Sequence, residues 1–193
     1  MERAQRDVRF PPDLRGRPGH PRTMTAYEAR PIGPSALKEL RTADDAGRPC
    51  VPYTATEDGD PLRCCLRGIG SGERVALVSY APLRRWAAET WARPGAYDEQ
   101  GPVFIHADEC EGPAPGRTGY PFSRAGALRT VRRYNADGEI VGGRLLEIPA
   151  DGEQGCDEAF AEAFADPEVA LVHVRAVEYG CFLFEVLPNR AGR

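Results

Sequence analysis

Two segments near the C-terminus alternate between apolar and polar side chains. In residues 169–177 and 181–187, every second position is apolar, and this period of two is typical of β-strands. A three-residue loop containing Gly180 separates them, and glycine is suited to the left-handed conformation that such a loop requires. The pattern predicts a β-hairpin at this end of the chain.

The register set by that loop sorts the side chains of the hairpin. It pairs Val174 with Phe184, His173 with Glu185 and Arg175 with Leu183, which leaves one face wholly apolar. The opposite face then collects the remaining polar groups: His173, Arg175, Cys181 and Glu185. We therefore predict a sheet that is buried on one side and carries candidate functional groups on the other.

Further elements follow from apolar runs between turn residues. Strands are expected at 74–80, 102–106, 127–134 and 140–148, and residues 63–66 are expected to be short and extended. The periodicity predicts a helix over 153–165, with shorter helical segments at 35–40 and 83–91. The predicted class is α+β: a mostly antiparallel sheet of about five or six strands with one or two covering helices.

The first 23 residues differ from the rest. They contain six arginines and four prolines but few apolar residues, which predicts a disordered tail, or a start site assigned upstream of a true start at Met24. Residues 24–193 are expected to form a single globular domain.

Charge and hydropathy exclude some classes of binding partner. The chain has 25 basic and 29 acidic side chains and a net charge of −4, which argues against nucleic-acid binding. It lacks both an apolar run of membrane-spanning length and the apolar start of a secretory signal. We expect a cytoplasmic protein without a membrane partner, whose ligand could be a small molecule.

The six cysteines are then read as free thiols, a metal site or a redox pair. Cys64 and Cys65 are adjacent, and neighbouring side chains of an extended segment point to opposite faces. From this we expect that the two thiols do not share one metal ion. Cys65 and Cys181 also fit a second interpretation, as small apolar filler in the core.

His106 and Cys110 are the leading candidates for chemistry. They form an H-x3-C pair at the end of a predicted strand, where imidazole and thiolate can reach one zinc or iron ion, or the imidazole can activate the thiol for catalysis. The neighbouring carboxylates of Glu109 and Glu111 would raise the pKa of a free thiol, which favours a metal-held thiolate. The alternative is a loop-capping histidine beside a packing cysteine.

The predicted pair of His173 and Glu185 has two interpretations. The carboxylate could orient the imidazole as a base, or the two could form a solvated cross-strand pair. Arg175 beside them could bind a carboxylate or phosphate, or pair with a surface acid. The chain contains no phosphate-binding loop, complete dinucleotide fingerprint, serine-hydrolase elbow or H-E-x-x-H motif.

Four blocks in order resemble a known family. They are L-R-C-C-L-R at 62–67, G-E-R-V-A-L-V-S-Y at 72–80, G-P-V-F-I-H at 101–106 continuing to Cys110, and V-H-V-R at 172–175 with Y-G-C-F at 179–182. This string, within 49–187, resembles the bacterial domain-of-unknown-function family numbered 1203. The resemblance implies no activity or cofactor, but it groups five residues in matching blocks: Cys65, His106, Cys110, His173 and Cys181.

Two functions remain open from the sequence. The first is a pocket built from these five residues, which binds zinc or iron or carries out thiol chemistry. The second is a non-catalytic module that binds a small molecule or another protein. In that case the same residues pack in the core or cap loops.

Overall fold

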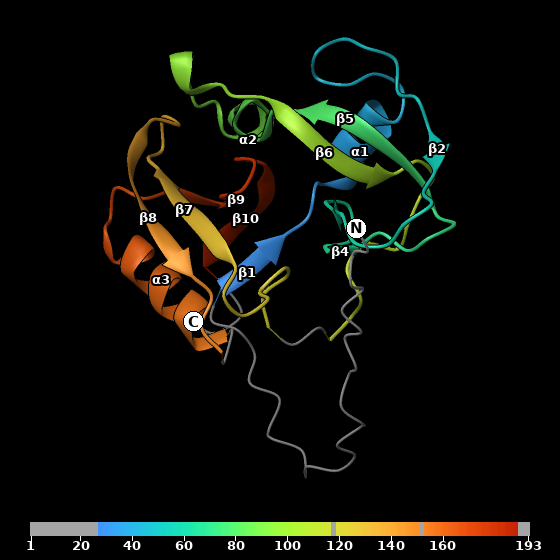
Figure 1. The fold of residues 1–193 in the computed structure, drawn as a ribbon. Coiled ribbons are helices and arrows are strands. Elements are labelled where there is room, and N and C mark those ends of the chain that lie inside the picture. Colours follow the sequence, from blue (N-terminus) through green and yellow to red (C-terminus); the bar gives the residue numbers. More distant parts are fainter. Residues whose placement is uncertain (1–26, 117–118, 151–152, 189–193) are drawn as a thin grey trace, which may run out of the picture.

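The described part of the chain combines two β-sheets with three α-helices. The structure is a computed structural model that describes residues 27–116, 119–150 and 153–188; the tail expected to be disordered, residues 1–23, lies outside them. The predicted α+β class is confirmed, but the described residues form two five-stranded sheets instead of one sheet of five or six strands. Figure 1 shows the two sheets side by side.

The C-terminal sheet has the strand order β1-β10-β9-β7-β8, and all its neighbouring strands are antiparallel. Its strands are β1 (Tyr27–Arg30), β7 (Leu128–Tyr134), β8 (Ile140–Glu147), β9 (Leu171–Ala176) and β10 (Phe182–Pro188). Strand β1 therefore lies at the edge beside β10, although the whole described chain separates them.

The N-terminal sheet has the order β2-β5-β6-β3-β4, with a parallel pair between β3 and β6 and antiparallel pairs elsewhere. Its strands are β2 (Tyr53–Thr54), β3 (Pro61–Leu62), β4 (Arg67–Gly68), β5 (Arg74–Tyr80) and β6 (Gly101–His106). Apolar alternation identifies the faces of a strand but not its neighbours, which is why the pattern could not divide the strands between two sheets.

The β7–β8 hairpin follows its turn chemistry. The Asn135 side-chain oxygen accepts the backbone N–H groups of Asp137 and Glu139, at 3.1 and 2.9 Å. Gly138 has a φ of +86°, and a Cβ there would come within 3.0 Å of Pro94. A side chain at position 138 would thus be strained and crowded.

The β9–β10 hairpin departs from the predicted register at one point. Val174 pairs with Phe184 and His173 with Glu185, as expected, but Arg175 lies opposite Phe182 because a bulge interrupts β10. The bulge puts Leu183 and Phe184 in one core cluster and Phe182 in the core of the N-terminal sheet. Both faces of this hairpin are therefore buried, and the prediction of one polar face is wrong.

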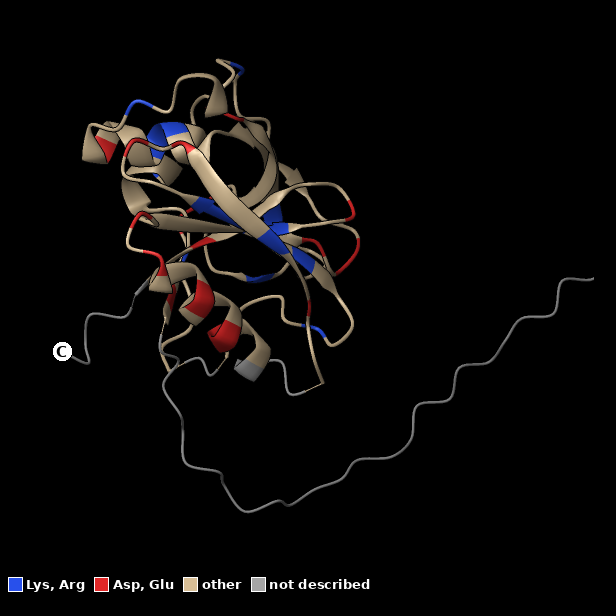
Figure 2. Ribbon diagram, turned by 90° about the vertical axis from the view of Figure 1, so that its left-hand side faces the viewer, with Lys and Arg blue, Asp and Glu red and all other residues tan. Residues whose placement is uncertain are grey.

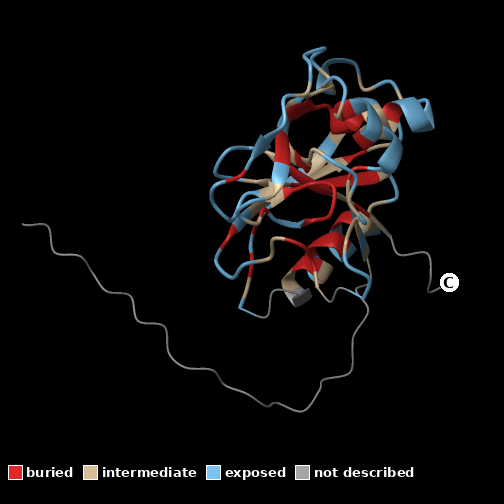
Figure 3. Ribbon diagram, turned by 90° about the vertical axis from the view of Figure 1, so that its right-hand side faces the viewer, coloured by how far each residue is buried: buried red, intermediate tan, exposed pale blue. Residues whose placement is uncertain are grey.

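Each helix covers a defined part of the sheets (Figure 1). The apolar face of α3 (Glu153–Ala165) packs on the C-terminal sheet, and α1 (Pro34–Leu40) packs on the core of the N-terminal sheet. Between them, α2 (Pro82–Thr90) inserts Leu83 against Tyr134 and Leu171. None of these helices has the length and apolarity of a membrane span. Figure 2 shows acidic segments on α3. Figure 3 shows buried segments running through both sheets.

A buried arginine joins the two sheets. Arg63 is only 3% exposed. Its guanidinium donates from Nε to the carbonyl of Phe182 at 2.8 Å and also donates to the carbonyl of Pro61. Burial lowers the pKa of Arg63 to about 10, so it stays charged at neutral pH. The rings of Tyr80 and Phe182 pack nearby with their centroids 5.6 Å apart.

His173 lies in the core. It is fully buried between the rings of Tyr134 and Phe182, with centroids 4.8 and 5.1 Å away, and within the described residues neither ring nitrogen has a hydrogen-bond partner. Glu185 instead forms an ion pair with Arg30 at 3.7 Å. Burial, with a smaller effect from the neighbouring arginines, lowers the pKa of His173 to about 3.

This depressed pKa predicts an acid-sensitive fold. Above pH 6.5 the imidazole is neutral in both states, whereas below it the unfolded chain takes up a proton that the fold excludes. Between pH 7.5 and pH 5.5 the unfolding free energy of the wild type should therefore fall by about 1.4 kcal/mol more than that of His173→Phe. Urea unfolding of both proteins at the two pH values measures this, and parallel pH dependence would contradict it.

Candidate metal centre

A tight turn places two cysteine side chains together. Residues 63–66 connect β3 to β4, the Leu66 N–H donates to the carbonyl of Leu62 at 3.0 Å, and buried Leu66 has a φ of +57°. The sulfurs of Cys64 and Cys65 lie 3.9 Å apart. The expectation that they point to opposite faces is wrong, because it assumed an extended segment and the chain turns there instead.

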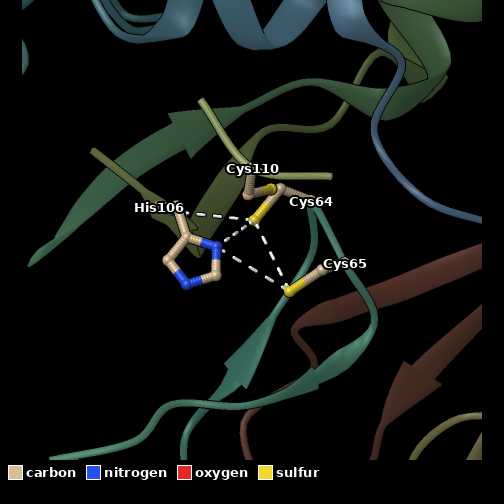
Figure 4. Close-up of side chains that lie close together, drawn as sticks. All are labelled: Cys64, Cys65, His106 and Cys110. Carbon is tan, nitrogen blue, oxygen red and sulfur yellow. Dashed lines mark hydrogen bonds between the residues drawn. The ribbon is translucent and has the colours of Figure 1, made fainter. Parts of the chain in front are cut away.

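His106 meets this pair from the neighbouring strand. It ends β6, whose Phe104 lies beside Leu62 of β3 in the parallel pair. Its Nδ1 is 3.3 Å from Cys64 Sγ and 3.8 Å from Cys65 Sγ, and its backbone N–H donates to Cys64 Sγ at 3.3 Å. The imidazole therefore presents Nδ1 to both sulfurs (Figure 4).

Cys110 completes a cluster of four side chains. It lies in the loop after β6, and its sulfur and the other three ligand atoms all lie within 4.8 Å of one another. Figure 4 shows its side chain next to Cys64. We call Cys64, Cys65, His106 and Cys110 the Cys3His cluster.

The cluster is shielded but reachable. Cys64 and Cys65 are buried, while His106 and Cys110 are partly exposed. A cavity of about 600 Å³ is lined by Cys64 and Cys110 on one side and by Lys38 and Arg41 of the α1 region on the other. An ion or small molecule can therefore approach the sulfurs from the α1 side.

The two vicinal thiols have opposite proton affinities. A hydrogen bond from Cys64 lowers the pKa of Cys65, and the electrostatic effects of the neighbouring His106 and Arg67 act in the same direction. The same hydrogen bond, together with burial, raises the pKa of Cys64. Together they behave as a single thiol–thiolate unit that holds its negative charge mainly on Cys65.

The far side of the imidazole faces an ion pair. His106 Nε2 is 3.6 Å from Glu73 Oε1 and 3.2 Å from the Arg67 guanidinium. Arg67 donates two hydrogen bonds to Glu73, at 2.6 and 3.0 Å, and the Gly70 N–H donates a third at 2.7 Å. These donors lower the pKa of Glu73 to about 2. The Glu73 carboxylate offsets the positive charge of Arg67 beside the imidazole, so a cation bound at Nδ1 would not face an uncompensated guanidinium.

The structure brings together three of the five residues that the sequence grouped. Cys65, His106 and Cys110 belong to the cluster, whereas His173 and Cys181 do not. His173 lies between aromatic rings on β9, and the Cys181 sulfur faces the carbonyl of Tyr179 at 3.7 Å. The sequence motifs group residues only by their order along the chain. His173 and Cys181 belong to the C-terminal sheet and its hairpin loop, so the two-sheet topology places them away from the cluster.

Arg175 and Glu185, the other candidate binding residues from the sequence, also have other partners. Arg175 Nη2 lies 2.9 Å from Glu99, and its Nη1 donates to the carbonyl of Gly180 at 2.8 Å. Glu185 pairs with Arg30. Both side chains thus contribute to interactions within the protein.

The sequence reasoning missed Cys64 and the pair of Arg67 and Glu73. The signal for Cys64 was its adjacency to Cys65 just before Leu66-Arg67-Gly68, where a tight turn instead of a strand would have aligned both thiols. For Glu73 there was no local signal, because it reaches His106 only through the pairing of β5 with β6.

The fold and the cluster define an α+β protein with a thiol-rich candidate metal centre. A family model matches residues 59–187, about two thirds of the chain, and its description is "Protein of unknown function (DUF1203)". The chain belongs to this family, which confirms the resemblance found in the sequence. Comparisons with curated proteins and with solved structures gave no match.

The shared charge of the vicinal pair is testable without metal. Cys64→Ala removes the S–H donor, so the pKa of Cys65 should rise and its alkylation at neutral pH should slow. The pH profile of iodoacetamide labelling at Cys65, followed by mass spectrometry in metal-free protein, measures this. Cys50→Ala is the matched control and should leave the profile unchanged; an unchanged profile in Cys64→Ala would refute the coupling.

Proposed function

We propose that this protein binds a thiophilic transition-metal ion of the zinc type through Cys64, Cys65, His106 and Cys110. The observation that carries the proposal is the mutual spacing of the four ligand atoms, all within 4.8 Å. Cys64 and Cys65 come from one turn and His106 from the end of β6, and backbone hydrogen bonds hold both segments in place, which supports a preformed site.

The spacing agrees with tetrahedral coordination. Zinc bound at about 2.3 Å to sulfur and about 2.1 Å to nitrogen separates two sulfur ligands by about 3.8 Å, and sulfur from nitrogen by about 3.6 Å. The corresponding distances are 3.9 Å between Cys64 and Cys65, and 3.3 and 3.8 Å from these sulfurs to His106 Nδ1. Small side-chain adjustments suffice to meet the ideal geometry.

Metal binding explains the vicinal pair better than a disulfide. Consecutive α-carbons across a trans peptide are about 3.8 Å apart, below the usual range for disulfide-linked cysteines. None of the six cysteines, all of which lie within the described residues, forms a disulfide. Two adjacent thiols with one shared negative charge are instead well suited to a cation, and a Cys3His donor set favours zinc or iron over magnesium or calcium.

Four protein ligands make a closed centre, which supports a structural or regulatory role for the ion. Cys110 is the ligand from a loop and borders the cavity, so it is the position at which another molecule could exchange. Thiolate ligands must remain reduced to bind metal, and this supports a cytoplasmic location.

Metal titration tests the proposal. We expect stoichiometric binding of Zn²⁺, and Co²⁺ should produce a thiolate-to-cobalt charge-transfer absorption. Cys65→Ser and His106→Gln should lower the Zn²⁺ affinity at least about 10-fold, whereas Cys181→Ser, which removes a thiol outside the cluster, should retain it. Competition with a chromophoric chelator supplies the affinities.

Other outcomes distinguish the remaining functions. Equal affinity in all four proteins would place any bound metal elsewhere and reject the proposed ligands. Failure to bind Zn²⁺ or Co²⁺, combined with reversible loss of two thiols on mild oxidation, would favour thiol chemistry at Cys110 instead.

The carboxylate behind His106 should tune the affinity. Glu73→Gln keeps a similar shape but removes the charge that offsets Arg67 beside His106, so Zn²⁺ should bind about 10-fold more weakly. Glu57→Gln, at an exposed position, is the matched control. If both variants bind like the wild type, Glu73 only anchors Arg67.

A further inference from the structure

A second cavity lies where the two sheets meet. Its volume is about 580 Å³, and its walls come from the β3 turn and β6 of the N-terminal sheet and from β7, β9 and the start of β10 of the C-terminal sheet. Arg63 lines this cavity, while the next residue, Cys64, lines the cavity of the metal centre. The turn therefore separates two distinct hollows.

Two enclosed arginines give this inter-sheet cavity its charge. The Arg63 guanidinium is hydrogen-bonded to backbone carbonyls, and in the described residues no carboxylate forms an ion pair with it. Arg129, with its side chain 12% exposed, donates to the carbonyls of Leu128 and Phe122 at 2.7 and 2.8 Å. Its ion-pair partner, Glu178, is 3.7 Å away and half exposed. Carbonyl groups satisfy donors without neutralising charge, so the cavity keeps a positive wall.

The remaining lining of the inter-sheet cavity consists of charged groups at its exposed edge and apolar side chains on its walls. Arg124 adds a third positive charge at the exposed edge, against the exposed carboxylates of Asp60 and Glu178. Apolar side chains form much of the remaining wall, among them Phe104, Phe122, Ala176 and Leu183. Positive charge with apolar walls is complementary to an anion that has an apolar body.

We propose that the inter-sheet cavity binds a small amphipathic anion, an organic acid whose charged end meets Arg129 and Arg124 and whose apolar body lies against Phe104 and Leu183. The anion would supply Arg129 with a closer negative partner than Glu178, which is 3.7 Å away. This site shares no lining residue with the Cys3His cluster, and it does not depend on metal binding.

A matched pair of fluorescent probes tests the charge requirement. The aromatic anion 8-anilinonaphthalene-1-sulfonate should bind the full-length wild type at one saturable site. Arg129→Gln should weaken this binding about 10-fold, but it should change binding of the uncharged N-phenyl-1-naphthylamine less than twofold. Arg74→Gln, an exposed arginine on the N-terminal sheet outside the cavity, is the control and should affect neither probe.

Arg129 also donates to the loop that contains Phe122, so a second variant guards against misfolding. Arg124→Gln changes only the exposed rim and should weaken binding of the sulfonate probe about threefold. If both arginine variants bind the sulfonate as tightly as the wild type, or lose both probes equally, the proposed anion site is rejected.

A half-buried thiol reports the location of the probe. Cys181 lines the cavity, whereas Cys50 has similar burial and lies outside it. Saturating sulfonate probe should slow iodoacetamide labelling of Cys181 at least about fivefold and leave Cys50 unchanged. Unprotected Cys181 would show that the probe binds elsewhere and would overturn the assignment.

Discussion

The position of the candidate metal centre depends on one buried cation. The guanidinium of Arg63 donates to the carbonyl of Phe182 in the other sheet and to that of Pro61 in β3, and the Arg63 backbone N–H donates to the carbonyl of Phe104 at 2.9 Å. Leaving a buried charge without these acceptors would be costly, so the turn after β3 is held in one place. Cys64 and Cys65 follow directly and inherit that position.

The same turn relates the two proposed sites. On one side the sulfurs of Cys64 and Cys65 face His106, whose Nε2 lies 3.6 Å from the charged Glu73. On the other side Arg63 contributes to the positive wall of the inter-sheet cavity. A metal ion would gather thiolates and an organic anion would meet guanidinium groups, so one short turn separates sites of opposite charge preference. The two chemistries are distinct even though they share a scaffold.

Individual elements were largely predictable from the sequence because their signals are local. The α3 helix has the predicted bounds, and the β7–β8 hairpin follows from Asn135 and Gly138. The β9–β10 register was correct for Val174 with Phe184 and His173 with Glu185, and it failed from the bulge between Phe182 and Phe184 onward to the loop. A bulge inserts one residue without altering the apolar character of the segment, so alternation alone does not reveal it.

The candidate site was only partly predictable. The amino-acid sequence by itself determined the class of fold, the family, and the interest of Cys65, His106 and Cys110, because residue type, period and motif order are properties of the chain. Tertiary structure alone decided that Cys64 joins them and that His173 and Cys181 lie elsewhere. The direction of Cys64 depends on a turn anchored by a residue 119 positions away, and the burial of His173 depends on how two sheets pack. Such long-range contacts leave no periodic trace in the neighbouring sequence.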